Sequence, residues 1–156
     1  MADTAKHHFE FVNLATPKLN ELRQRIDGVD LRVTREYLGL TTAWLSEYLG
    51  VAERSVHRWE SGERPIPTGV RAGIEHLEAA TAAFVEEALA ALRDAKDSTL
   101  VTYRTDSDYR QHQPDAGPDS TDGTSRTPWP ASWHRAVCAR VARQVPGGVE
   151  LRYWSS

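Results

Sequence analysis

The sequence lacks cysteine pairs, long apolar runs and an excess of basic charge, features that would point directly to a secreted, membrane or nucleic-acid-binding protein. It has one cysteine, Cys138, among 156 residues. An intrachain disulfide is therefore excluded, and a reducing, cytoplasmic location is expected. No apolar run is long enough to span a membrane, and residues 1–16 lack the apolar core of a signal peptide. The net charge of −3 gives no overall basic signature, so any binding of an anionic partner depends on local charge.

Signatures of catalysis and of cofactor binding are also missing. No metal-ligand spacing, phosphate-binding loop or suitable pair of carboxylates is evident, and the aspartates of residues 105–131 do not match a calcium loop. His134 and Cys138, at i and i+4 on a predicted helix, are the one candidate pair of base and nucleophile. The simpler interpretation is a thiol beside an exposed imidazole. We therefore expect no enzyme activity, no metal and no cofactor.

Residues 38–62 carry most of the information that is present. They predict two short helices, at about 42–49 and 53–61, joined by a tight turn at Gly50, where a left-handed residue would end the first helix. Thr41 is suited to cap the first helix, whereas Ala52 stands where a capping hydroxyl would precede the second. The apolar positions predicted to form the buried frame are Leu45, Leu49, Val56 and Trp59.

These residues resemble the Cro/repressor (XRE-like) class of helix-turn-helix DNA-binding domains. The matching pattern is Leu-Gly-Leu-Thr at 38–41, a small residue after Leu45, Leu-Gly-Val at 49–51, Val-x-x-Trp-Glu-Ser-Gly at 56–62, and Pro67. The resemblance covers about residues 30–67 and implies that the helix at 53–61 enters the major groove. It also implies a bracing helix at 31–38, which Asp30 would cap, and a structural ion pair between Arg35 and Glu60.

The candidates for contacting DNA are the residues outside the buried stripe of the second helix. The helical pattern alone would favour a solvated polar face, and the resemblance favours DNA contact instead. Arg54 and Arg58 lie at i and i+4, and an arginine fork can bond O6 and N7 of guanine. By resemblance, Thr42, Ser61 and Arg64 would contact phosphate, although the family commonly has glutamine at the position of Thr42. The full candidate set is Thr42, Glu53, Arg54, Ser55, His57, Arg58, Ser61 and Arg64.

The local charge of this region is balanced. Residues 31–67 contain five arginines and five glutamates, which gives a net charge of zero. Non-specific attraction to the phosphate backbone should therefore be modest. We expect specific contacts and dimerisation to supply the affinity.

Residues 68–96 predict a long helix that starts after Pro67. Its apolar positions follow a near-heptad spacing and are Val70, Ile74, Leu77, Thr81, Phe84, Ala88 and Leu92. Such a seam is consistent with a core helix that packs within one chain, and also with a dimer interface. Both interpretations can hold for different parts of the helix.

Residues 97–156 predict a small α+β module. We expect a strand at 99–104, a mobile acidic loop at 105–131, a helix at 132–144 capped by Ser132, and a strand at 149–154. This module is too small to stand alone, so it should pack on the long helix or pair with a second subunit. The predicted fold is thus mainly α: an arm at 1–28 with a short helix at 18–26, a helix-turn-helix domain at 29–67, the long helix at 68–96, and a C-terminal dimerisation module.

The order of these parts resembles the YdiL-like and anti-CRISPR-associated transcriptional regulators. The matching pieces are Trp59-Glu60-Ser61-Gly62, Pro67, the strand ending at Tyr103, Trp133-His134-Arg135 and Leu151-Arg152-Tyr153-Trp154. The resemblance implies a homodimeric repressor that binds an inverted-repeat operator in double-stranded DNA. One alternative is a protein-interaction module of the antitoxin or phage-inhibitor type, suggested by the acidic loop and exposed tryptophans. RNA binding is another, because residues 131–156 carry a net charge of +3.

Overall fold

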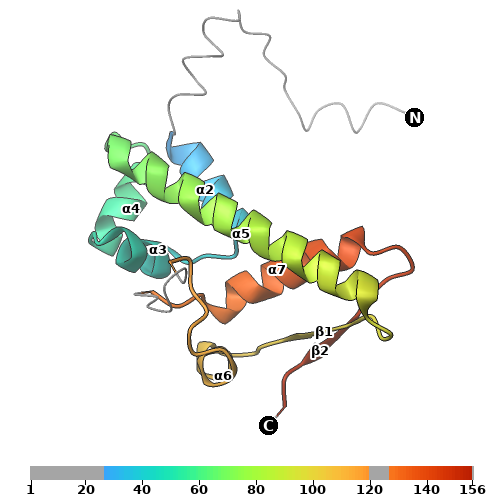
Figure 1. Cartoon of the computed structure of the whole chain (residues 1–156). Helices are drawn as coiled ribbons and strands as arrows, with labels where there is room; N and C mark the ends of the chain where they lie inside the picture. Colours follow the sequence, from blue (N-terminus) through green and yellow to red (C-terminus); the bar gives the residue numbers. More distant parts are fainter. Residues whose placement is uncertain (1–26, 120–126, 156) are drawn as a thin grey trace, which may run out of the picture.

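The computed structural model describes residues 27–119 and 127–155, which are mainly helical and include one two-stranded sheet. In chain order the elements are α2 (Gly28–Tyr37), α3 (Thr42–Leu49), α4 (Glu53–Glu60), α5 (Thr68–Asp94), β1 (Thr99–Thr102), α6 (Asp106–His112), α7 (Ala131–Gln144) and β2 (Glu150–Tyr153) (Figure 1). The arm and helix expected within residues 1–26 lie outside the described residues, as does part of the expected loop, at 120–126.

The two helices predicted on either side of Gly50 are present, and their bounds agree with the expected ones to within one residue. Thr41 accepts a hydrogen bond from the backbone N–H of Trp44 at 3.1 Å, so it caps α3. Gly50 ends α3 with φ of 67°, a left-handed conformation in which a side chain would be strained. Ala52 precedes α4 without a side-chain cap, as the sequence indicates.

The bracing helix starts earlier than expected. Its N-cap is Asp27, whose carboxylate accepts from the backbone N–H of Asp30 at 2.9 Å, while the Asp30 side chain reaches back to the backbone N–H of Asp27. The prediction that Asp30 caps the helix was therefore wrong, because Asp30 is the third helical residue of a reciprocal capping box. The change adds one turn to the start of α2.

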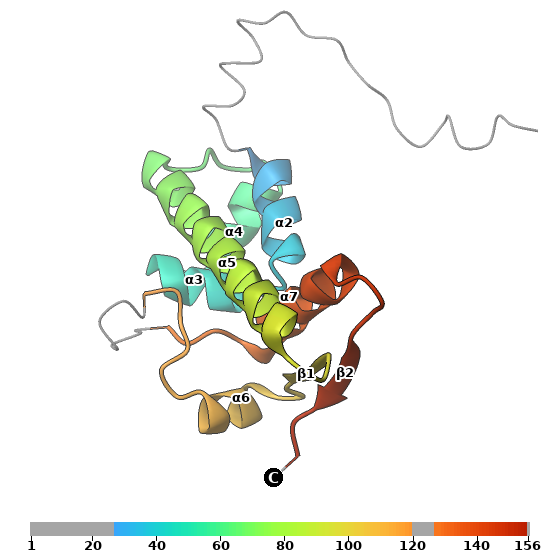
Figure 2. The ribbon, with the colours of Figure 1, turned by 45° about the vertical axis from the view of Figure 1, so that its right-hand side comes forward.

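The long helix α5 packs within the chain. Its start lies over α2, α3 and α4, and its second half lies along α7 (Figures 1 and 2). The buried positions are Val70, Ile74, Leu77, Thr81 and Val85. Phe84 is half-buried and meets Trp133 of α7 edge-on, with ring centroids 5.1 Å apart. The core-helix interpretation of the seam is confirmed, since apolar side chains of the same chain cover it.

The two strands predicted near the C-terminus form a parallel sheet. The register pairs Thr99 with Glu150 and Thr102 with Tyr153. Parallel strands need a crossover connection, which α6 and α7 supply. Helix α7 packs against β1 on one side and α5 on the other, so the C-terminal module shares the core of the whole chain.

The expected acidic loop is largely structured in the part that the structure describes. Thr105 and Asp108 form a capping box that starts α6, and the Asp106 carboxylate accepts from the backbone N–H of Ala131 at 2.8 Å. These aspartates are therefore not simply solvated charge. Ser132 does not cap α7 either, because Pro130 holds the N-cap position and the Ser132 hydroxyl donates to the Gly39 carbonyl at 2.6 Å.

Aromatic side chains join the two parts of the core. Trp44 of α3 stacks on Trp129, which stacks on Trp133 of α7 with ring centroids 4.0 Å apart and planes at 2°. The indole N–H of Trp44 also donates to the Pro128 carbonyl at 2.8 Å. The expectation of exposed tryptophans was wrong: four of the five are buried, and Trp154 is half-buried. Their burial follows from this contact between segments far apart in sequence.

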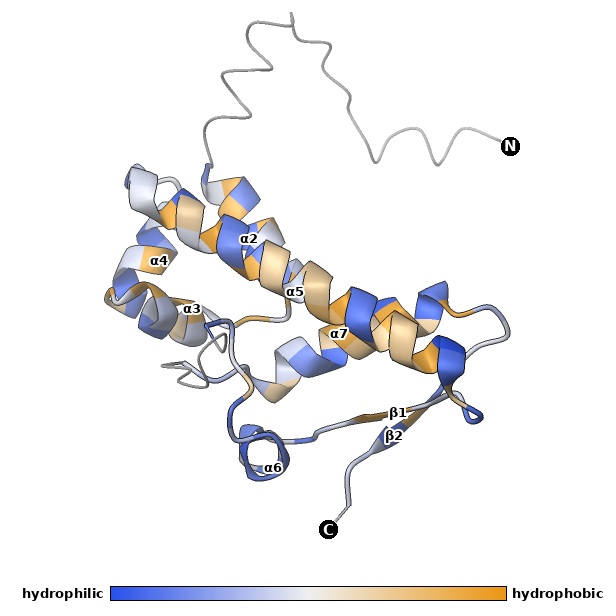
Figure 3. Ribbon diagram, viewed as in Figure 1, coloured by the Kyte–Doolittle hydropathy of each residue, from blue (hydrophilic) through white to orange (hydrophobic). Residues whose placement is uncertain are grey.

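Hydropathy along the ribbon reflects this arrangement. Apolar and polar segments alternate along α5 and α7, while α4 and α6 are largely hydrophilic (Figure 3). Within the described ranges, no helix combines the length and apolarity needed to cross a lipid bilayer.

Candidate nucleic-acid interface

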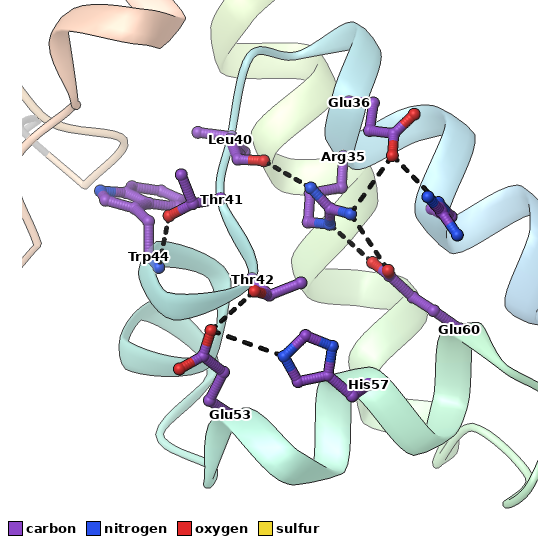
Figure 4. Close-up of polar contacts among 10 residues, drawn as sticks. Arg35, Glu36, Leu40, Thr41, Thr42, Trp44, Glu53, His57 and Glu60 are labelled. Carbon is purple, nitrogen blue, oxygen red and sulfur yellow. Dashed lines mark hydrogen bonds and ion pairs between the residues drawn. The ribbon is translucent and has the colours of Figure 1, made fainter.

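A buried ion pair fixes α4 against α2. Arg35 donates through Nε to Glu60 Oε1 at 2.6 Å and through Nη2 to Oε2 at 3.0 Å, and its Nη1 donates to the Leu40 carbonyl at 2.8 Å (Figure 4). The two side chains are only 11% and 7% exposed. This bidentate geometry satisfies most of the polar atoms of both groups. Arg35 and Glu60 are therefore structural charges and are not available to a ligand.

A second network joins the start of α3 to the first turn of α4. The Thr42 hydroxyl donates to Glu53 Oε1 at 2.7 Å, and His57 Nε2 lies 3.6 Å from the same oxygen (Figure 4). All three side chains stand at the surface rather than in the core. The Glu53 carboxylate thus orients Thr42 and His57, and it partly offsets the positive charge of the neighbouring arginines.

The outer face of α4 borders an open groove of about 460 Å³. Its lining residues are Arg32, Arg54, His57, Arg58, Glu60, Ser61 and Glu63. Among the described residues, the Arg54 guanidinium has no hydrogen bond or ion pair. Arg58 lies 3.6 Å from Glu63, a long and exposed contact that contributes little. Arg54 and Arg58 can therefore both present donors to a bound group.

The electrostatic character of this groove is positive although the surrounding sequence is neutral. Of its two lining carboxylates, Glu60 is neutralised by Arg35 and Glu63 lies beside Arg58. Arg32 pairs with Glu36, which lies outside the groove, so the guanidinium group of Arg54 remains in excess. A groove with several planar, bidentate donors suits phosphate oxygens and the acceptor edge of guanine.

The structure brings together half of the predicted contact residues. Arg54, His57, Arg58 and Ser61 line the groove, and the other four candidates do not. Thr42 and Glu53 adjoin it through His57, Ser55 is half-buried on the inner side of α4, and Arg64 is exposed just after the helix. The Ser61 hydroxyl donates to the Arg58 carbonyl at 3.2 Å, so it also supports the end of α4.

Sequence reasoning missed Arg32 as a residue of this face. Arg32 lies on α2, one turn before Glu36, and its Nε donates to the Glu36 carboxylate at 3.0 Å. That hydrogen bond and the negative charge of Glu36 raise the pKa of the Arg32 guanidinium. The signal that could have found it is its place beside Arg35. Once Arg35 is assigned to Glu60 across the helix pair, the residue three positions earlier, one helical turn away on the same side of α2, is expected near α4 as well.

The only candidate catalytic pair of the sequence is buried and uncharged. His134 is 8% exposed, not exposed as expected, because Trp133 and Tyr109 pack around it. Burial, helped by the charge of Arg135, lowers the pKa of His134 to about 4, and burial raises the pKa of the Cys138 thiol. His134 Nδ1 and Thr102 Oγ1 are hydrogen-bonded at 2.9 Å. A neutral thiol beside a neutral imidazole lacks the thiolate that nucleophilic chemistry needs.

Comparisons with known proteins agree with the geometry. A family model described as Aca2/YdiL-like matches residues 19–118, which is more than half of the chain. A protein of Pyrococcus furiosus, named as an HTH-type transcriptional regulatory protein, is 43% identical over 53 residues. That alignment covers 34% of this chain and 17% of the Pyrococcus protein, so the chain spans less than a fifth of the length of this relative.

Proposed function

Because the chain belongs to the Aca2/YdiL-like family, we propose that it is a sequence-specific, homodimeric repressor that binds an inverted-repeat operator. The family and the Pyrococcus relative indicate a transcriptional regulator. In the proposed complex, α3 and α4 act as a helix-turn-helix unit. Helix α4 lies in the major groove, and the N-terminal end of α3 approaches the phosphate backbone.

The observation that supports this proposal best is the groove beside α4. Arg54 and Arg58 project from one face of a helix whose opposite face is held by Val56, Trp59 and the Arg35–Glu60 pair. A rigid helix that presents one unpaired guanidinium group, of Arg54, and one weakly paired group, of Arg58, is suited to read guanine edges. Arg32, Ser61 and Arg64 lie at the margins, where the DNA backbone would pass, so we assign them phosphate contacts that fix register without reading sequence.

Two-fold symmetry would match the palindromic form of the operator. Each protomer would place one α4 in a major-groove segment, with the two segments about 34 Å apart. A single neutral domain should bind weakly, so the affinity would depend on both half-sites being occupied together. Binding through two half-sites would thus compensate for the zero net charge of residues 31–67.

The test compares base discrimination in the full-length protein and its variants. An operator is first selected from random duplexes and from the DNA beside the gene. Competition binding is then measured for every single-base substitution. We expect Arg54→Ala and Arg58→Ala each to abolish the preference at one base pair per half-site, a loss of about 1–3 kcal/mol of discrimination.

The matched control is Arg71→Ala on α5, which removes a half-buried arginine paired with Glu75 at 2.7 Å on a different helix. This change should leave every base preference intact. If Arg54→Ala and Arg58→Ala weaken binding equally on all sequences, α4 contributes only backbone contacts and the base-reading assignment is wrong.

No observation favours a second function. The protein-interaction alternative depended on exposed tryptophans and a mobile acidic loop, and the tryptophans are buried while much of the described loop is ordered by α6. The RNA alternative depended on the net charge of residues 131–156. Three of those four arginines make hydrogen bonds within the chain: Arg135 donates to the Tyr103 carbonyl, Arg140 to the Tyr37 carbonyl and Arg152 to the Glu150 carboxylate.

A further inference from the structure

Strand β2 has an uncovered outer edge. The sheet contains only β1 and β2 among the described residues, so one edge of β2 pairs with β1 and the other has no partner strand there (Figure 2). All four residues of β2 are exposed, including Leu151 at 50% and Tyr153 at 48%. Apolar side chains on an open strand edge form a template for pairing with another strand.

The backbone of Leu151 and Tyr153 faces this open edge. The N–H groups of Glu150 and Trp154 donate to carbonyls of Ser98 and Thr102, at 2.8 and 2.7 Å. Backbone groups of successive strand residues point to opposite edges, so Leu151 and Tyr153 direct their N–H and C=O groups away from β1. These two residues can exchange hydrogen bonds with an added antiparallel strand.

The charges of β2 select a register for pairing with itself. An antiparallel pair about a two-fold axis can be centred on any of the four residues of β2. Centring on Tyr153 leaves no other residues of the two strands opposite each other, so it gives the shortest possible pairing. Centring on Glu150 or on Arg152 sets that residue against its own copy, which places like charges opposite each other. Centring on Leu151 instead sets Glu150 opposite Arg152 of the partner subunit, and it does so twice.

The same register also suits the backbone. With the axis at Leu151, this residue and Leu151 of the partner subunit exchange both hydrogen bonds. Glu150 and Arg152 of the partner subunit then form a non-hydrogen-bonded pair, in which Cα atoms are about 4.5 Å apart and side chains are closest. Within one chain, Arg152 Nε already donates to Glu150 Oε1 at 2.8 Å, so both side chains extend on the same face of the sheet.

We propose that β2 pairs antiparallel with β2 of a second copy, centred on Leu151, and so forms a continuous four-stranded sheet across the dimer. The interface rests on the homodimer of the proposed function and names the surface that makes it. The pairing satisfies the open backbone groups and buries Leu151 against its copy. It also extends the face on which Arg104 lies over the Tyr153 ring, 4.4 Å from its centroid.

The test uses two full-length charge variants. Each should dimerise poorly alone, and the two should dimerise with each other when mixed. Arg152→Glu gives a strand with two glutamates, and Glu150→Arg gives a strand with two arginines. In either homodimer both cross-strand pairs become repulsive, so we expect self-association, measured by analytical ultracentrifugation, to weaken about tenfold or more. An equimolar mixture restores both pairs in trans and should form heterodimers with at least the wild-type affinity.

The possible results of this test distinguish a failure of the β2 interface from a failure of the homodimer proposal. A wild-type protein that stays monomeric overturns both. A dimeric wild type whose single variants dimerise equally well overturns the β2 interface and leaves the homodimer standing. Variants that weaken without recovery in the mixture overturn the register. The matched control is Arg71→Glu, which reverses one charge of the Arg71–Glu75 pair on α5 and should leave association unchanged.

Hydrogen exchange supplies a readout that needs no variant. The amides of Leu151 and Tyr153 should exchange more slowly as protein concentration rises through the dimer dissociation constant, because they become bonded across the interface. If the wild type is dimeric but these amides exchange equally fast at low and high protein concentration, the proposed pairing is wrong.

The charge variants of β2 should keep the native fold, because Glu150 and Arg152 are 57% and 65% exposed. Circular dichroism verifies this.

Discussion

The polar side chains buried in this protein all have hydrogen-bond partners. Among the described residues, no buried side-chain nitrogen or oxygen lacks a hydrogen-bond partner. Arg35 and Glu60 illustrate the point with a bidentate pair, and its existence was predictable from the family pattern. His134 was not, because a histidine between Trp133 and Arg135 is equally compatible with an exposed or a buried side chain.

His134 makes the stability depend on pH. Its pKa is lowered to about 4 in the folded chain, against about 6.5 when unfolded, so below pH 6.5 the unfolded state binds a proton that the folded state does not. The stabilisation is complete above pH 6.5 and is lost as the pH falls towards 4. One such group changes the free energy of unfolding by about 1.4 kcal/mol per pH unit, or about 3 kcal/mol in total.

Urea unfolding between pH 7 and pH 4 measures this dependence. Other groups also titrate in this range, so the comparison is with His134→Gln, which cannot titrate. The variant should be less stable at pH 7, because a fitted ring that bonds Thr102 is lost, but its stability should fall less steeply with acid. Parallel pH profiles for the two proteins would show that His134 does not carry the effect.

At the scale of elements, the helices are held by close backbone contacts as well as by side chains. Gly28 is the first residue of α2 and lies against the backbone of Trp59 and Glu60 at the end of α4. A Cβ atom there would lie 2.3 Å from the Trp59 carbonyl oxygen, far inside contact distance. The approach of these two helices therefore requires glycine, and it sets the position of α4 relative to Arg32.

Gly28→Ala should separate α2 from α4. We expect a loss of about 1–3 kcal/mol in the free energy of unfolding, since backbone atoms must shift to admit the methyl group. Gly69→Ala is the matched control in α5, because a Cβ there meets no atom within 4 Å. That change should stabilise the protein by about 0.4–1 kcal/mol. Denaturant titration of both variants measures the difference, and equal effects would contradict the close-contact explanation.

Helices whose ends are marked by residues within the same segment were predictable from the sequence. Segments ordered by contacts with residues far away in the sequence were not. Thr41, Gly50 and Pro67 mark helix ends by their own chemistry, and α3, α4 and α5 follow those marks closely. The segment around α6 is rich in aspartate, serine and glycine, which is typical of a loop. It is ordered because Asp106 bonds the start of α7 and Trp129 inserts between Trp44 and Trp133, contacts that no local pattern reveals.

At the scale of the whole molecule, helices α3 and α4 share one core with the C-terminal module. The stack of Trp44, Trp129 and Trp133 crosses from α3 to α7, and the Trp133 indole N–H donates to Thr81 of α5 at 3.0 Å. Helix α7 contacts α5 and the sheet together, which agrees with the expectation that the C-terminal module packs on the long helix.

Trp129→Ala should weaken the entire protein rather than one module. Removing a ring that is 5% exposed and stacked on both faces should cost about 3–5 kcal/mol. Trp154→Ala removes a half-buried ring near the end of β2 and should cost less. Probes of helix content and of aromatic packing should give coincident unfolding transitions for Trp129→Ala. Two separate transitions would show that the modules unfold independently.

The tryptophan stack also bears on how the proposed dimer would tolerate variation in its operator. Adding one base pair between half-sites moves one of them by about 3.4 Å and turns it by roughly 35° around the duplex axis. A flexible linker between reading and pairing modules could absorb that change. Here stacked indoles and the hydrogen bond from Trp44 to the Pro128 carbonyl replace such a linker. In the proposed dimer, this rigid connection would make binding depend on the spacing between half-sites as well as on their bases.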